Sequence, residues 1–349
     1  MIKKFFRDNS VHKNIVKYFD FLFLFNIPYF FVLLMLFVWG MSASNYSRGI
    51  EQINYFLLNF SVLDSLFFVF LFLFLSFVNV KIQIDDLLIL DWDNKDNQYK
   101  LNLNYLYVCP NFISIKKVNS FLNIPIILLT LVPIAYISPY LWPILVLYYI
   151  LINRFNHKLL KTESYLIFIK RCILKLFCFY LIFLSGWVYV STFDISMLQY
   201  FPLFCLAVLP VIFMNELIFV DKFSEKESKN RIIIQNDKNR ITFLSLIMML
   251  SLFFISFSID DSILSHFSII SVPFFIYAFI RSEFKDFVRC YSYPIMIMNI
   301  LVSWTLYPIL LFVQIIIYYL SKYYYWSWPC RFKRCSVCSK IRLKNNSFR

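Results

Sequence analysis

The stretch LQYFPLFCLAVLPVIFMNELIFVDKFSEKESKNR runs from Leu198 to Arg231 and contains the pattern that decides the fold. Its first part is an apolar run about as long as the roughly 20 residues that cross a bilayer as a helix. The run ends at Asp221, where acidic and basic side chains begin to alternate. This boundary indicates a membrane-spanning helix that continues into a charged connection on one side of the bilayer.

The composition extends this interpretation to the whole chain. Of its 349 residues, 60% are hydrophobic, 21% are aromatic and only 15% are charged, which excludes a water-soluble fold. The apolar runs are unbroken rather than alternating, so we expect helices and not the strands of a barrel. The sequence therefore predicts an all-α polytopic membrane protein.

Nine apolar segments can be placed along the chain. They cover residues 20–41, 62–81, 121–138, 139–153, 171–192, 198–220, 242–258, 264–280 and 295–320. The first follows basic residues, but its apolar run is longer than the core of a signal peptide and has no small-residue cleavage site, so we expect a span. Residues 121–153 contain four prolines and are too long for one span and short for two.

The distribution of Lys and Arg favours two spans in that region. Cytoplasmic connections collect these residues, and they are concentrated in the N-terminus and in residues 81–120, 154–171, 221–241 and 281–289. Two spans between 121 and 153 keep the alternation in phase. The N-terminus is then predicted to be cytoplasmic, in a bacterial inner (plasma) membrane. Because the bases lie in the connections, the net charge of +14 does not call for a nucleic-acid partner.

The chain divides into a transmembrane domain, residues 1–326, and a basic tail, residues 327–349. The tail carries a C-x4-C-x2-C pattern formed by Cys330, Cys335 and Cys338. No fourth Cys or His lies nearby, which leaves metal binding, a disulfide, lipidation and no function as open alternatives. Nine spans place the tail outside, and a re-entrant turn around Pro308 would restore the parity.

Two of the basic connections are also rich in acidic residues, and they follow the second and the sixth spans. The first contains Asp85, Asp86, Asp91, Asp93 and Asp96. The second contains Glu216, Asp221, Glu225 and Glu227. If these helix ends face one cavity, Mg²⁺ would bridge their carboxylates to a diphosphate while Lys and Arg neutralise the remaining charge. The alternative is that these acids and bases solvate the membrane surface and pair with one another.

This layout resembles the UbiA superfamily of intramembrane prenyltransferases. The shared features are nine spans, acidic loops after spans two and six, and a basic connection after span four. The stretch FMNELIFVDKFSEKESKNR, followed by NDKNRITFLSLIMML, is similar to the second acidic motif and the helix after it. The resemblance implies one bundle of about nine helices around a central cavity, with the ends of spans two and six facing each other.

The resemblance also implies the site residues and the reaction. Mg²⁺ is expected on the catalytic carboxylates Asp86, Asp91, Asp221 and Glu225. Substrate binding is expected from Arg154, Lys158, Lys222, Asn215 and Lys95. The implied partners are an isoprenoid diphosphate and a lipophilic acceptor, both in the lipid bilayer, and the implied reaction is transfer of the prenyl group.

The chain departs from the family pattern, because its first acidic connection has no N-x-x-x-D-x-x-x-D spacing. It has only three glycines, Gly40, Gly49 and Gly186, so we expect Ser and Ala at close helix contacts. The competing hypothesis is a non-catalytic membrane protein, either a transporter or a lipid-binding relative. A transporter needs ionisable residues in mid-span, whereas Lys175 and Glu216 are expected near helix ends.

Overall fold

The computed structural model describes residues 27–47, 62–89, 121–155, 165–191, 195–223, 228–259 and 261–306. Within these residues the chain is helical apart from short turns and has no strand, which confirms the predicted all-α fold there. The elements are α3 (Ile27–Ser47), α5 (Val62–Ile89), η1 (Ile126–Leu131), α8 (Val132–Ile137), α9 (Trp142–Phe155), α10 (Tyr165–Val190), α11 (Ile195–Phe223), α12 (Ser228–Ser258), α13 (Ser262–Arg281) and α14 (Phe284–Leu306).

Each predicted span overlaps a helix in the described part of the chain. Five helices contain a stretch that is long and apolar enough to cross a membrane: Val62–Ile82, Phe168–Val190, Ile195–Leu217, Lys238–Ser258 and Ile263–Arg281. The protein is therefore an integral membrane protein. The turn predicted at Pro308 and the cysteine-containing tail lie outside the described residues.

Residues 121–155 form a helical hairpin, in agreement with the prediction of two segments. Its arms are residues 121–137, which include η1 and α8, and the helix α9. The chain leaves the helical conformation at Ser138, with φ −139° and ψ 80°, because the proline that follows disfavours an α-helical residue before it. Across the hairpin, the hydroxyl of Tyr149 donates a 2.8 Å hydrogen bond to Oδ1 of Asn123.

A close crossing joins α3 to α10, and two glycines make it possible. A Cβ atom at Gly40 would overlap the carbonyl oxygen of Phe183, and a Cβ atom at Gly186 would overlap the carbonyl oxygen of Phe37. The two backbones touch where neither helix has a side chain. The expectation that Ser and Ala supply the close contacts is wrong for this pair, because the positions of the glycines matter more than their number.

Aromatic side chains fill the space beside this crossing, between α3, α10 and α11. Trp39 stacks on Phe204 with ring centroids 5.3 Å apart, and Phe183 stacks on Tyr200 at 5.7 Å. Trp39 and Phe183 meet edge to face at 5.1 Å. Since Trp39, Phe183 and Phe204 are all buried, this cluster holds the three helices in a defined arrangement.

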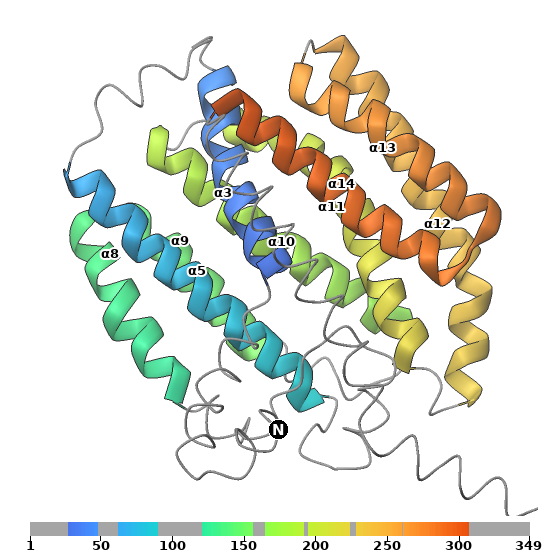
Figure 1. The fold of residues 1–349 in the computed structure, drawn as a ribbon, viewed down its shortest axis with the longest axis horizontal. Coiled ribbons are helices and arrows are strands. Elements are labelled where there is room, and N and C mark those ends of the chain that lie inside the picture. Colours follow the sequence, from blue (N-terminus) through green and yellow to red (C-terminus); the bar gives the residue numbers. More distant parts are fainter. Residues whose placement is uncertain are drawn as a thin grey trace, which may run out of the picture.

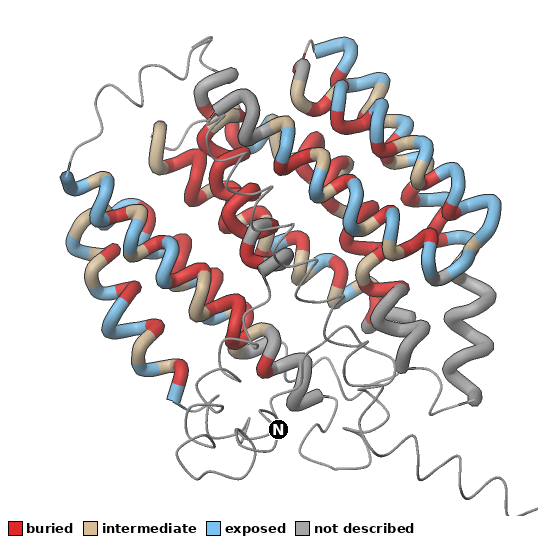
Figure 2. Tube along the Cα trace, in the orientation of Figure 1, coloured by how far each residue is buried: buried red, intermediate tan, exposed pale blue. Residues whose placement is uncertain are grey.

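The centre of the molecule consists of α3, α10, α11 and α14 (Figure 1). The helices α5, α8 and α9 lie on one side of this centre, and α12 and α13 lie on the other. Buried residues concentrate in the central helices, while many apolar residues on α5, α12 and α13 are exposed (Figure 2). Exposed apolar faces on the outer helices are expected where lipid surrounds a bundle.

Tyrosine–aspartate hydrogen bonds connect helix ends on the side where α5, α11 and α13 begin. Tyr189 of α10 donates a 2.7 Å bond to Asp64 in the first turn of α5. Tyr200 of α11 donates a 3.0 Å bond to Oδ2 of Asp261. Oδ1 of Asp261 accepts two backbone N–H groups at the start of α13 and so caps that helix.

Candidate functional site

A pocket lies where α3, α10, α11, α13 and α14 meet. It contains about 570 Å³ of space that no atom fills, including the space at its open mouth. The central helices that build it are those held together by the glycine crossing and the aromatic cluster.

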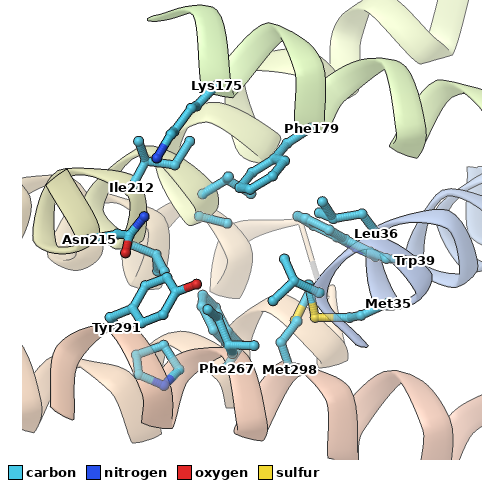
Figure 3. A pocket seen from close by; sticks show the side chains of 16 residues that line it. Met35, Leu36, Trp39, Lys175, Phe179, Ile212, Asn215, Phe267, Tyr291 and Met298 are labelled. Carbon is cyan, nitrogen blue, oxygen red and sulfur yellow. The ribbon is translucent and has the colours of Figure 1, made fainter. Parts of the chain in front are cut away.

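Most of the wall of this pocket is apolar. Figure 3 shows the apolar side chains Met35, Leu36, Trp39, Phe179, Ile212, Phe267 and Met298 around the space. The aromatic rings give fixed surfaces, whereas the two methionines have flexible side chains that adapt to irregular shapes. The pocket can therefore widen around a chain without moving the helices.

Three polar side chains lie together at one end of the pocket. They are Lys175 from α10, Asn215 from α11 and Tyr291 from α14 (Figure 3). Asn215 lies eight residues before the end of α11, or about two helical turns. The polar end of the pocket therefore lies toward the end of the bundle where α11 terminates.

Lys175 also belongs to a charge triad with Arg171 and the buried Glu216. Nε of Arg171 lies 3.2 Å from Oε2 of Glu216, and Nζ of Lys175 contacts Oε1 of the same carboxylate. The side chain of Glu216 is fully buried, that of Arg171 is 16% exposed and that of Lys175 is 32% exposed. Lys175 is thus the most accessible member of the triad and contacts both the carboxylate and the pocket.

Helical spacing and antiparallel packing produce this triad. Arg171 and Lys175 are four residues apart and share one face of α10. The next helix runs in the opposite direction, which brings Glu216, near the end of α11, to the level of these two cations. Lys175 lies about three turns inside α10, because that helix begins at Tyr165, before its apolar run. The expectation that Lys175 lies near a helix end is therefore wrong.

Of the residues predicted to bind substrate or metal, Asn215 is described together with its side chain and lines the pocket. Others lie on described helices, but their side chains are outside the described part: Asp86, Arg154, Asp221 and Lys222. The rest lie outside the described residues: Asp91, Lys95, Lys158 and Glu225. Within the described residues no group of three or more His, Cys, Asp or Glu could hold a metal ion. The Mg²⁺ site therefore stays a prediction.

The helices that lead into the two acidic connections end on the same side of the bundle. The C-terminal ends of α5 and α11 both lie at the lower end of the bundle in Figure 1. This arrangement is the one expected if the two connections share one side of the membrane. The cytoplasmic identity of that side stays a prediction.

The sequence analysis missed Lys175 and Tyr291 as pocket residues. A signal for Lys175 was present, because charged residues stand at matching depths in two successive apolar runs: Arg171 and Lys175 in one, Glu216 in the next. Opposite charges at one depth of neighbouring membrane helices predict a pair. No comparable signal marked Tyr291 in a chain with 24 tyrosines.

Comparisons of the chain with protein-family models, with curated proteins and with solved structures found no match. The resemblance to the UbiA superfamily therefore stays a prediction.

Proposed function

We propose that this integral membrane protein binds one amphiphilic lipid, with the apolar chain in the pocket and the polar head beside Lys175, Asn215 and Tyr291. The observation that carries the proposal is the position of these three polar groups at one end of an otherwise apolar pocket. A molecule with an apolar chain and a polar head matches both parts of this site.

The apolar chain alone would give little selectivity. A hydrocarbon chain in the bilayer already has apolar surroundings, so its transfer into the pocket gains little free energy from the hydrophobic effect. Selection therefore depends on the shape set by the rings of Trp39, Phe179 and Phe267 and on the contacts of the head.

Photo-crosslinking tests this proposal. The probe is a fatty acid with a diazirine in its chain, added to the full-length protein in lipid nanodiscs. We expect crosslinks on the wall residues of α3 and α14, including Met35 and Met298. The variant Val208→Phe places a larger side chain in the wall and should remove most of this crosslinking. Leu198→Phe is the matched control on the same helix, since Leu198 is 65% exposed.

The location of the crosslinks decides the outcome. Crosslinks confined to the outer faces of α12 and α13, and unchanged in Val208→Phe, would contradict binding in the pocket. Size-exclusion chromatography of each variant shows whether the bundle still folds.

Prenyl transfer is the second candidate function, and the position of the polar end of the pocket favours it. Asn215 lies about two turns from the end of α11 that leads to Asp221 and Glu225. The helix α5, which leads toward Asp86 and Asp91, ends on the same side of the bundle (Figure 1). Four carboxylates form a donor set that suits Mg²⁺, which would neutralise charge on a departing diphosphate.

In this second function the pocket would hold the prenyl chain. The bond between the allylic carbon and the diphosphate oxygen would break, and a new bond would form to a lipophilic acceptor. Positive charge that develops on the allylic carbon is stabilised by aromatic faces such as those of Trp39 and Phe179. Lys175 and Lys222 would offset the negative charge of the leaving group.

Transfer of a radiolabelled prenyl group from its diphosphate, measured in membranes with and without a chelator, tests this function. Asp221→Asn keeps the shape of the side chain and removes its charge, so we expect a loss of about a hundredfold or more in rate. Glu227→Gln is the control and should have a much smaller effect. Activity that survives both Asp221→Asn and the chelator would reject the metal-dependent mechanism.

A further inference from the structure

We propose that the end of the bundle where α13 meets α14 is a surface that binds anionic phospholipids of the surrounding bilayer. Five cations form this surface, which we call the basic rim: Lys238 and Arg240 of α12, Arg281 of α13, and Lys285 and Arg289 of α14. The three helices are neighbours on one side of the molecule (Figure 1). Such binding needs the membrane location of the protein and not an occupied pocket.

Contacts between the three helices show that the cations lie at one level of the bundle. Ser282, in the connection between α13 and α14, donates a 3.0 Å hydrogen bond to Oδ1 of Asn239 in α12. Nζ of Lys238, also in α12, lies 4.6 Å from the ring centroid of Phe287 in α14. The cations of α12 therefore lie beside those of the connection, although more than 40 residues separate them in the sequence.

Two carboxylates within the basic rim position its arginines without neutralising it. The buried carboxylate of Asp286 lies 3.6 Å from Nε of Arg281 and 3.1 Å from Nη1 of Arg289, and Glu283 accepts a hydrogen bond from Arg281. The two arginine side chains nevertheless stay 41% and 47% exposed. Even with Asp237 included, whose side chain lies outside the described part, these residues sum to a charge of +2.

An exposed apolar stripe on each helix starts beside an exposed arginine of the rim. The stripes follow helical spacing and consist of residues that are between 38% and 51% exposed: Phe243, Leu244 and Ile247 after Arg240, Tyr277 and Ile270 before Arg281, and Tyr293, Met296 and Ile300 after Arg289. The guanidinium carbon of Arg281 lies 5.4 Å from the centroid of the Tyr277 ring, at the boundary between charge and stripe. A phospholipid has the same arrangement, with a charged phosphate directly above its acyl chains.

The sign of the charge selects among phospholipids. Residues 241–280 and 290–306, which form the rest of these helices, contain no Lys or Arg, and the other end of α12 and α13 has Asp261 instead. The rim therefore meets the head groups of one leaflet, and its excess positive charge favours a head with a net negative charge over a zwitterionic head. None of the cations has to be unpaired, because arginine has five N–H donors and an exposed ion pair leaves some of them to water or a ligand.

Photo-crosslinking with two lipids tests this inference. The full-length protein is placed in nanodiscs of phosphatidylcholine that contain a trace of phosphatidylglycerol or of phosphatidylcholine, each with the same diazirine-bearing acyl chain. We expect phosphatidylglycerol to label the stripes about fivefold or more over phosphatidylcholine, the effect of about one cation near the head group. The preference should shrink at about 1 M salt.

The outer face of α5 provides an internal reference in the same samples. Val69 and Phe72 are exposed there, and Lys81, the single cation of α5, is buried. The two lipids should label these two residues about equally. An equal preference for phosphatidylglycerol on α5 and on the stripes would overturn a specific surface at the basic rim.

Variants of the rim identify the residues responsible. The double variant Arg240→Gln, Lys285→Gln removes two cations and keeps Arg281 and Arg289, which pair with the buried Asp286. It should lower the labelling preference to less than about twofold. Lys285→Gln alone, at an exposed position, should lower the preference in part on α14. The matched control Lys170→Gln removes an exposed cation from α10 and should leave the preference unchanged.

Three results would overturn the inference. The first is equal labelling of the stripes by both lipids in the unmodified protein. The second is a preference that persists in the folded double variant, with folding measured by size-exclusion chromatography. The third is a preference that inorganic phosphate abolishes while chloride at the same ionic strength does not, since this would show a site for a soluble anion.

Discussion

Helix α10 packs against two neighbouring helices through contacts of different kinds. Against α3, Gly186 and Gly40 let backbone meet backbone, with no charged group in the crossing. Against α11, Arg171 and Lys175 contact the buried carboxylate of Glu216. The first contact has one arrangement, because backbone atoms cannot move aside. The second has a movable part, because the lysine side chain is long and flexible.

Each of these two contacts positions a different part of the pocket. The glycine crossing fixes the distance between the helices that supply Trp39 and Phe179 to the pocket wall. The charge triad supplies Lys175 to its polar end. A binding site needs a wall of constant shape and a head group contact that can adjust. In this molecule two contacts of α10, about three helical turns apart along the helix, provide the two.

The largest expected effect comes from substitutions in the crossing. Gly40→Val or Gly186→Val places side-chain atoms where the backbone of the other helix already lies. We expect each to cost more than about 4 kcal/mol of folding free energy, or to yield no folded protein. Thermal unfolding and size-exclusion chromatography in detergent measure this. Ser42→Val, at a half-buried position of α3, is the control and should have little effect.

Normal folding of both glycine variants would contradict the rigid nature of the crossing, because it would show that the two helices can move apart. A mild cost for the smaller change Gly40→Ala, with a severe cost for Gly40→Val, would show how far the helices can separate.

The next effect concerns the charge triad. Glu216→Gln leaves Arg171 and Lys175 without the carboxylate that both contact, so we expect a loss of about 3 kcal/mol in folding free energy. Lys175→Gln leaves one cation with one carboxylate and should cost much less. Unfolding of the two variants under the same conditions measures the difference. Equal losses would show that the net charge of the triad is not the controlling quantity.

A smaller effect is expected at the helix ends on the opposite side of the bundle. Tyr200→Phe keeps the ring that stacks on Phe183 and removes the hydroxyl that bonds to Asp261. We expect a loss of about 1 to 2 kcal/mol in folding free energy, because a hydrogen bond to a carboxylate is lost while the cap of α13 remains. Tyr136→Phe is the control, since Tyr136 is 92% exposed. A loss as large as that of Glu216→Gln would contradict this ranking.

These contacts also show how far the sequence predicts the structure. The helices were predictable because the length and hydrophobicity of each apolar run indicate a membrane-spanning helix, whichever helices lie beside it. The break before Pro139 followed from the geometry of proline. The role of Gly40 and Gly186 was predicted wrongly, because a count of glycines does not show that two of them meet.

The candidate site was predictable only in part. Asn215 was expected at a binding site from a resemblance, and the structure describes it in a pocket wall. Lys175 and Tyr291 join it there only because α10, α11 and α14 are neighbours, which hydropathy does not reveal. The predicted carboxylate site between the acidic connections depends on Asp86, Asp91, Asp221 and Glu225 and stays a prediction.

The smallest effect is expected at the exposed connection between α13 and α14, where an ion pair has neither a fixed backbone contact nor burial. Arg281 donates a 2.6 Å hydrogen bond to Glu283, and the two side chains are 41% and 51% exposed. This bond and the charge of Arg281 lower the pKa of the Glu283 carboxyl below its ordinary value of 4.5. The lowered pKa means that ionised Glu283 contributes stability above pH 4.5 and loses that contribution as the pH falls further, through its pKa in the folded state.

Since solvent screens exposed pairs, we expect only a slight decrease in melting temperature for Glu283→Gln near neutral pH, and a smaller one in high salt. Melting curves of both proteins between about pH 7 and about pH 3 measure this, and the curves should converge at low pH, where protonated Glu283 resembles glutamine. A difference in melting temperature that stays constant across this pH range would show that Glu283 acts through packing rather than charge. The connection would then resemble the glycine crossing and not the charge triad.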